Sequence, residues 1–414
     1  MNNLQVVHSS LIVVEEGTLK KAGFVVLLAI GLLLAAGMAH AGWSWTLSTS
    51  GTNPSHRGGH VMAYDTESDR VILFGGWAGE YDPRIGRLRG EESNETWAYD
   101  ANTDTWTNVT VPGPPPRTVA AMAYDSESDR IVLFGGATGP FPSSEFGDTW
   151  TYDYDSRTWT NMSPANGPPS RRAHAAAYDA QSDRVIIFSG YIGKNDTWAY
   201  DDNTNTWTNM APPVFPSGGW GLGMAYDSQS DLVVLFRAGR ARNQTWTYDV
   251  DGNTWTNRTD GHGPPGRVFS AIAYDAHSDR TIVFGGLAVD SVGAETPLSD
   301  TWAYDANDNA WSNMTPNVGP SPRSALAGAY DSESDRFVTY GGQTSWTNVT
   351  NETWTYSDAS PENPPTSWPL VVGAAALLVA GATTVVALAI VRRRKRGPQG
   401  ERTRSGSRRD GGRA

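Results

Sequence analysis

The sequence predicts an all-β protein built from six copies of one four-stranded unit. Three repeated features support this fold class: the tripeptide Ala-Tyr-Asp occurs six times at intervals of 48 to 60 residues, an aromatic residue closes an apolar run eleven residues after each of those alanines, and a Thr-Trp pair follows each run. The stretches between them are rich in Gly, Pro, Asn, Asp, Ser and Thr, as expected for short strands joined by turns. A repeat of this period is typical of an architecture with one structural unit per copy.

The four strands of each unit follow in a fixed order. The first ends in Ala-Tyr-Asp, the second is the apolar run, the third carries Thr-Trp-x-Tyr, and in the first five units the fourth carries a second Trp nine residues further on. Polar turns connect the first strand to the second and the third to the fourth, and a Gly-Gly pair ends the second strand in four units. Four strands in about fifty residues describe one blade of a β-propeller. The alanines that mark the blades are Ala63, Ala123, Ala177, Ala225, Ala273 and Ala329.

The sixth unit lacks a fourth strand, and the beginning of the chain offers one. Asn363 occupies the place where the second Trp of this unit should stand. Trp45 precedes the first Ala-Tyr-Asp by 18 residues, which is also the spacing between Trp159 and Ala177. We therefore expect residues 43–49 to form the outer strand of the last blade and to close the ring, because an open ring would leave a sheet edge unpaired.

The order of these motifs resembles the kelch repeat. A Pro-Pro-x-Arg segment, an apolar strand, Phe-Gly-Gly, Thr-Trp-x-Tyr-Asp and a Trp nine residues later recur over residues 43–356. The resemblance implies a six-bladed kelch-type β-propeller over residues 42–357, a fold that usually serves as a binding or scaffolding platform and occasionally as an enzyme. The expected blades are residues 52–108, 109–161, 162–209, 210–257, 258–313 and 314–357, the last completed by 43–49.

The two ends of the chain predict a membrane protein. Residues 1–41 end in a long apolar run that follows Lys20 and Lys21 and closes on Ala-His-Ala, which is the pattern of a signal peptide or, if it is not cleaved, of an N-terminal anchor. After a linker at 358–367, residues 368–391 carry no charge and are long enough to form a transmembrane helix. The basic tail at 392–414 then predicts a single-pass protein of the cell membrane, with a cytoplasmic tail and an extracytoplasmic propeller.

Charge and cysteine content exclude several functions. Between residues 42 and 368 there are 20 Lys and Arg against 40 Asp and Glu, so this region lacks the basic face that nucleic-acid binding requires. The chain has no cysteine, which excludes disulfides, thiolate metal sites and cysteine nucleophiles. His60 and His174 show no metal-ligand spacing, and no catalytic motif is present. We expect a monomeric ectodomain with no cofactor, no metal and no enzymatic activity.

The connections between second and third strands vary most in length, so ligand contacts are expected there. The first of them, residues 77–95, is the longest and carries an aromatic and cationic cluster on an otherwise acidic domain. It is the preferred binding loop, with a solvated, glycosylated insertion as the alternative. The candidate ligand-binding residues in it are Trp77, Tyr81, Arg84, Arg87 and Arg89.

An arginine recurs six residues before the Ala-Tyr-Asp in every unit except the fourth. A hydrogen bond or ion pair between blades is one interpretation, and a ring of cations at the channel mouth that attracts an anionic ligand is the other. These arginines are Arg57, Arg117, Arg171, Arg267 and Arg323.

The fourth unit departs from the pattern at the same end of the blade. Gly219 replaces the arginine, and Arg237 stands where four other units have glycine, with Trp220 and Arg240 nearby. Arg237 is expected either to supply the missing guanidinium or to form a local binding site.

Nine Asn-x-Ser/Thr sequons are possible glycosylation sites on an extracytoplasmic domain, although repeats rich in Asn and Thr also create sequons by composition. They lie at Asn94, Asn108, Asn161, Asn195, Asn243, Asn257, Asn313, Asn348 and Asn351. The favoured function is a binding or adhesion module for a protein or glycan partner. The alternatives are an extracytoplasmic carbohydrate-active enzyme on the same scaffold and a structural protein of the cell envelope.

Overall fold

A computed structural model describes residues 42–82, 87–139, 143–191, 194–238, 243–289, 294–345 and 348–358. Within these ranges the chain forms antiparallel β-sheets and no α-helix, which confirms the all-β class. No helix among them is long and apolar enough to cross a membrane. The predicted signal segment, transmembrane helix and basic tail lie outside the described residues.

Six four-stranded sheets account for most of the strands. In each sheet the strand that ends in Ala-Tyr-Asp is the innermost, and it pairs with the apolar strand that follows it. The innermost strands of sheets 1 to 6 are β3 (Val61–Asp65), β9 (Ala121–Asp125), β15 (Ala175–Asp179), β19 (Gly223–Asp227), β24 (Ala271–Asp275) and β30 (Ala327–Asp331). The second strands are β4 (Arg70–Phe74), β10 (Arg130–Phe134), β16 (Arg184–Phe188), β20 (Leu232–Ala238), β25 (Arg280–Phe284) and β31 (Arg336–Tyr340).

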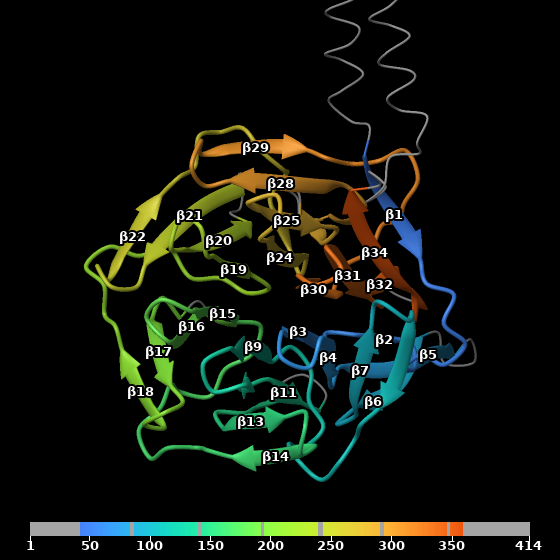
Figure 1. Cartoon of the computed structure of the whole chain (residues 1–414), viewed down its shortest axis with the longest axis horizontal. Helices are drawn as coiled ribbons and strands as arrows, with labels where there is room; N and C mark the ends of the chain where they lie inside the picture. The colour runs from blue at the N-terminus through green and yellow to red at the C-terminus, as the bar shows by residue number, and fades with distance from the viewer. Residues whose placement is uncertain are drawn as a thin grey trace, which may run out of the picture. The chain divides into compact units, whose positions relative to one another are not determined.

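The two outer strands of each sheet carry the repeated tryptophans. The third strands are β7 (Thr96–Asp100), β13 (Thr149–Asp153), β17 (Thr197–Asp201), β21 (Asn243–Asp249), β28 (Thr301–Asp305) and β34 (Thr353–Asp358). The outermost strands are β8 (Thr105–Asn108), β14 (Thr158–Asn161), β18 (Thr206–Asn209), β22 (Thr254–Asn257), β29 (Ala310–Asn313) and β1 (Trp43–Leu47). Each innermost strand contacts the innermost strands of both neighbouring sheets, so the six sheets surround a common channel as in a β-propeller (Figure 1).

The first strand of the chain completes the last sheet. Strand β1 pairs antiparallel with β34, with Trp45 opposite Tyr356, as the spacing of Trp45 predicts (Figure 1). The Trp45 side chain is 6% exposed and packs on Phe284 of the neighbouring sheet, with ring centroids 4.5 Å apart. Sheet 6 is therefore built from both ends of the described chain.

A hydrogen bond from the outer Trp of each sheet fastens that sheet to the preceding one. In all six sheets the indole Nε1 donates to the Oγ1 of the Thr that precedes the third-strand Trp of the neighbour, over 2.8 to 3.0 Å. Trp45 follows the same rule by donating to Thr301. The six donors and acceptors are Trp45 to Thr301, Trp106 to Thr353, Trp159 to Thr96, Trp207 to Thr149, Trp255 to Thr197 and Trp311 to Thr245.

Polar turns connect the strands at one side of the ring, which we call the turn side. After each Ala-Tyr-Asp, the Asp accepts two backbone N–H groups of the turn, as Asp125 does from Glu127 and Ser128. The Tyr hydroxyl donates to an Asp five residues further on, as Tyr124 does to Asp129. These turns hold many carboxylates close together, because each neighbouring sheet presents the same sequence.

Asp129→Asn is expected to raise the melting temperature at pH 7.5. Burial, together with the charges of Asp65 and Glu67, raises the pKa of Asp129 to about 6. An acid whose pKa is raised on folding destabilises the folded chain increasingly as the pH rises from its unfolded value towards its folded value. Asn fits this position, since Asn205 accepts the hydrogen bond of Tyr200 with the same positive φ in another turn. Thermal unfolding should show a smaller increase in melting temperature at pH 5 than at pH 7.5. Equal increases at the two pH values would contradict this explanation.

Short hairpins extend the connections on the opposite side of the ring, which we call the mouth side. The connections between second and third strands form β5 (Trp77–Asp82) with β6 (Arg87–Glu92), β11 (Ala137–Thr138) with β12 (Ser144–Glu145), β26 (Leu287–Val289) with β27 (Glu295–Pro297), and β32 (Gln343–Ser345) with β33 (Asn348–Val349). Two further strands, β2 (Arg57–Gly58) and β23 (Arg267–Val268), pair with β5 and β26. The variable connections are thus ordered as hairpins over much of their length.

Candidate functional site

A closed circle of backbone hydrogen bonds surrounds the channel on the mouth side. One residue from each sheet donates its N–H to the carbonyl of the equivalent residue in the preceding sheet, over 2.7 to 3.0 Å. All six have positive φ values, between 48° and 66°, which turn the chain sharply into the innermost strand. The residues are Gly59, Val119, Ala173, Gly221, Phe269 and Ala325. This circle fixes a rigid rim around the channel.

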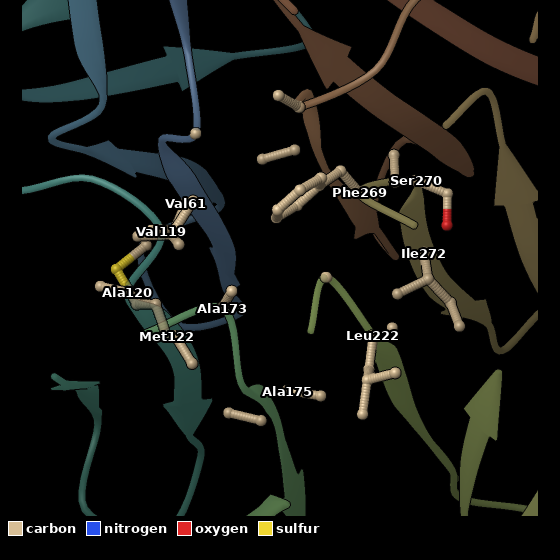
Figure 2. Close-up of a pocket in the computed structure, with 18 of the residues that line it drawn as sticks. Val61, Val119, Ala120, Met122, Ala173, Ala175, Leu222, Phe269, Ser270 and Ile272 are labelled. Carbon is tan, nitrogen blue, oxygen red and sulfur yellow. The ribbon is translucent and has the colours of Figure 1, made fainter. Parts of the chain in front are cut away.

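The channel inside this rim is narrow and is lined mainly by small and apolar side chains. A cavity of about 160 Å³, which we call the channel cavity, is lined by the beginnings of all six innermost strands. Figure 2 shows Met122, Leu222 and Ile272 from three different sheets around this space, with Val119 and Phe269 at the rim. Apart from His60, His174 and Ser270, the described side chains that line it carry no polar group that could bind a ligand.

Two further cavities lie above the rim. The mouth cavity, of about 270 Å³, is lined by residues of the rim together with Trp77, Trp220, Leu287 and Glu295. The side cavity, of about 180 Å³, lies between hairpins β26–β27 and β32–β33 and shares Glu295 with the mouth cavity. The mouth cavity shares lining residues with the channel cavity and with the side cavity, so the three are adjacent, and together we call them the mouth site.

Two of the aromatic residues singled out in the sequence meet in the mouth site. Trp77, at the start of β5, and Trp220, in the connection between sheets 3 and 4, both line the mouth cavity although they are far apart in the chain. Trp220 is 38% exposed and packs against Phe269, with ring centroids 5.3 Å apart. Large exposed aromatic rings beside a cavity are the usual anchors of a bound partner.

The other candidate residues of the first connection belong to a hairpin or lie outside the described residues. Tyr81 belongs to β5, and Arg87 and Arg89 belong to β6, so the predicted binding loop is largely a hairpin. Arg84 and Arg240 lie outside the described residues. The sequence also missed three residues of the mouth site, Phe269, Leu287 and Glu295, which it could not mark because none of them repeats or stands in a motif.

The five repeated arginines are buried in ion pairs, and each pair lies within one sheet instead of between sheets. Each is at most 2% exposed, and its guanidinium donates to backbone carbonyls within its own sheet and to a carboxylate just before the third strand. Arg171, for example, forms two hydrogen bonds of 2.8 and 2.7 Å with Asp196. The pairs are Arg57 with Glu95, Arg117 with Asp148, Arg171 with Asp196, Arg267 with Asp300 and Arg323 with Glu352.

Each of these carboxylates also accepts a hydrogen bond from the third-strand Trp, as Asp196 does from Trp198 over 2.8 Å. Burial alone would raise the pKa of these carboxyls, but the hydrogen bond and charge of the arginine outweigh it and hold the pKa below its usual value. The carboxylates are therefore ionised and fully engaged at neutral pH. An anionic ligand would have to displace them to reach the arginines.

In sheet 4 the arginine pairs with a neutral side chain in place of a carboxylate. Arg237 of β20 donates to Gln244 over 3.1 Å and to Ser217, while Gln244 occupies the position that is acidic in the other sheets. Burial lowers the pKa of Arg237, and the side chain is 6% exposed. Of the two roles expected for Arg237, the structure favours the first, in which it supplies the guanidinium that Gly219 lacks. Arg237 does not line the mouth cavity.

Two buried histidines lie beside the rim. Burial, helped by the charges of Arg57 and Arg171 respectively, lowers the pKa of His60 and of His174 to about 3, so both are neutral at physiological pH. Their rings pack edge-on against Tyr340 and Phe134. They contribute packing to the rim and carry no charge there.

The sequons lie mostly at exposed positions. The exposed asparagines are Asn94, Asn108, Asn161, Asn195, Asn257, Asn313 and Asn348, and Asn243 and Asn351 are half-buried. Several of the exposed ones have a turn role, since Asn108, Asn257 and Asn313 each accept the N–H of the Thr two residues later. Their glycosylation stays a prediction.

Comparison with known proteins decides the family. Residues 33–235 match the family model described as the KLHDC2/KLHL20/DRC7 Kelch-repeats domain. This region of the chain is a kelch-repeat domain. The kelch repeats explain why the Gly pair, the paired tryptophans and the repeated arginine all serve the structure of the sheets rather than one local site.

Two curated proteins share part of these kelch repeats. The chain is 29% identical over 151 residues to the dynein alpha chain of the flagellar outer arm from Chlamydomonas reinhardtii, which covers 35% of this chain and 3% of that protein. It is 25% identical over 146 residues to Mei4-dependent protein 6 of Schizosaccharomyces pombe, which covers 33% of this chain and 19% of that protein. The kelch chain therefore spans a minor part of the length of both relatives.

Proposed function

We propose that this protein is a six-bladed kelch propeller that binds a segment of a partner protein at the mouth site. The observation that carries the proposal is the mouth cavity itself, where aromatic side chains from separate connections converge on a rigid rim. Kelch repeats are associated with protein interaction, which favours a binding role. The apolar lining with few polar groups suits the side chains of a peptide better than it suits a small polar metabolite.

The other entrance of the channel is less suited to selective binding. A cavity of about 320 Å³ on the turn side is lined by six equivalent tyrosines. Each of their hydroxyls already donates to the Asp of its own turn. These residues serve the repeat, whereas the lining of the mouth cavity differs from sheet to sheet, as expected for a surface that recognises one partner. The tyrosines are Tyr64, Tyr124, Tyr178, Tyr226, Tyr274 and Tyr330.

The proposal includes an extracytoplasmic location. The apolar segments at 22–41 and 368–391 and the basic tail after the second of them support a membrane anchor with the propeller outside the cytoplasm. Trp43 of β1 lies opposite Asp358 of β34, so the chain enters and leaves the ring at the same place. Because neighbouring strands alternate in direction, this place is on the turn side of the ring.

Replacing Trp77 and Trp220 together by Ala is expected to lower the affinity for peptides selected on the mouth site at least tenfold, because central aromatic anchors dominate such contacts. The peptides are obtained by displaying a random library against the full chain, and affinity is measured by calorimetry. The melting temperature should change little, since Trp220 is partly exposed.

Phe215→Ala is the matched control for this experiment. Phe215 is 45% exposed and lies in the same connection as Trp220, but it does not line the mouth cavity. Unchanged peptide affinity in the double tryptophan variant, or an equal loss in the Phe215 variant, would refute the mouth site. Selection of glycans in place of peptides in a parallel array would support the other ligand class.

A further inference from the structure

One carboxylate oxygen of the mouth site has no partner in the described part of the fold. Oε2 of Glu295 is buried and has no hydrogen-bond partner among the residues that the structure describes. Glu295 opens β27 and lies opposite Val289 in the register of the hairpin. The five acids that pair with the repeated arginines have two or more donors each, so Glu295 stands apart from the acids of the repeat.

The surroundings of Glu295 are neutral and largely apolar. Leu287, Pro297, Ser324 and Gln343 line the side cavity with it, and Trp77, Trp220 and Phe269 line the mouth cavity. Glu295 is the charged residue of both linings, and no Lys or Arg is among the described residues that form them. A buried carboxylate oxygen without a donor is unfavourable for the free protein, so a ligand that brings a donor would recover this energy.

We propose that the mouth site binds an organic cation on an apolar stem, with its ammonium or guanidinium group at Oε2 of Glu295 and its apolar part in the mouth cavity. In a partner protein this corresponds to a Lys or Arg side chain next to an apolar residue. The inference rests on the proposed function and adds the chemistry of the partner to it.

Other ligand charges fit this arrangement less well. An anionic group would be repelled by Glu295, and a neutral apolar group would leave the carboxylate oxygen buried and unpaired. A divalent metal ion requires several oxygen ligands, whereas the two cavities present one carboxylate. The aromatic rings of Trp77 and Trp220 add a favourable face for a cation.

The test compares three probes that share a stem and differ in charge: 4-phenylbutylamine, 4-phenylbutan-1-ol and 4-phenylbutyrate. Their dissociation constants for the full chain are measured by ligand-observed NMR titration. We expect the amine to bind about tenfold more tightly than the alcohol, as for a charge-assisted hydrogen bond, and the carboxylate to bind most weakly. Glu295→Gln should remove the preference for the amine.

Glu91→Gln is the matched control, because Glu91 is an exposed carboxylate on β6 that does not line either cavity. This variant should keep the order of the three probes. Equal affinities in the wild type, no binding of any probe, or a preference for the amine that survives Glu295→Gln would each overturn the inference.

Stability gives a second readout that does not depend on a ligand. Glu295→Gln neutralises a carboxylate whose buried oxygen has no donor, so the melting temperature of the variant should equal or exceed that of the wild type. A fall in melting temperature would mean that Glu295 serves the fold, and the inference would fail. If the displayed peptides depend on Trp77 and Trp220 but show no enrichment of Lys or Arg, the cation inference fails while the proposed function stands.

Discussion

Deleting residues 42 to 50 is expected to lower the melting temperature of the ring by about 10 °C or more. The deletion removes β1, and with it the hydrogen bonds to β34 and the buried side chain of Trp45. Truncating a buried Trp alone costs about 3 to 5 kcal/mol, and each kcal/mol lowers the melting temperature of a large domain by about 2 to 4 °C. Loss of β1 also exposes the edge of β34 to solvent.

The effect should arise from ring closure rather than from any change in this segment. Leu47→Ser is the control, because Leu47 is 46% exposed at the end of the same strand, and it should leave the melting temperature nearly unchanged. Trp45→Ala should account for much of the loss, since Trp45 also contacts Phe284 and donates to Thr301 in sheet 5. An unchanged melting temperature in the deletion variant would contradict closure by β1.

Complementation in trans provides a sharper measurement. A synthetic peptide with the sequence GWSWTLSTSG should restore part of the melting temperature of the deletion variant, because an extended peptide can add to an exposed sheet edge. The same peptide with Ala at the position of Trp45 should restore much less. If both peptides act equally, the indole does not contribute to closure.

The sequence predicted the repeated part of the fold because the repeat multiplies each signal. The strand order within a unit and the closing role of Trp45 both follow from spacings that recur in several copies. The repeats also contain a signal that identifies the partners of the arginines. The residue before each Thr-Trp pair is acidic in the five units that have the arginine, and it is Gln244 in the unit where Gly219 replaces it. This covariation within one chain identifies the ion pairs.

The mouth site could not be predicted to the same extent. Its rim is formed by backbone groups of residues as different as Gly59, Val119 and Phe269, so no residue type marks the positive φ that they share. Glu295 lies in a hairpin whose neighbour in space comes from the next sheet. Sites built from non-repeated residues of several connections depend on tertiary packing, which spacing along the chain does not reveal.

Arg171→Met is expected to destabilise the fold by about 3 kcal/mol or more, because removing one partner of a buried ion pair leaves the other charge uncompensated. Asp196 would keep the hydrogen bond from Trp198 and lose both hydrogen bonds from the guanidinium. The double variant Arg171→Met with Asp196→Leu should be less destabilised than Arg171→Met alone, since an apolar pair of similar volume does not require a counter-charge. Urea unfolding of Arg171→Met, Asp196→Leu and the double variant gives the comparison.

Arg184→Met is the matched control, since Arg184 pairs with Asp201 over 3.0 Å but its side chain is 35% exposed. A solvent-exposed pair of this kind contributes less than about 1 kcal/mol. Equal losses in the Arg171 and Arg184 variants would contradict a special role of the buried pairs. So would a double variant whose free energy of unfolding falls by as much as the sum of the falls in the two single variants.

The loss of stability in the Arg171→Met variant should also depend on pH. Although burial would raise it, the pKa of Asp196 is held below its usual value by the hydrogen bond and charge of Arg171. A carboxyl with a depressed folded pKa stabilises the protein above its unfolded pKa of about 3.9, and this contribution disappears as the pH falls through the folded value. The difference between wild type and variant should therefore be constant from pH 6 to 8 and shrink below about pH 4. A difference that grows on acidification would show that the arginine acts through packing and not through the charge of Asp196.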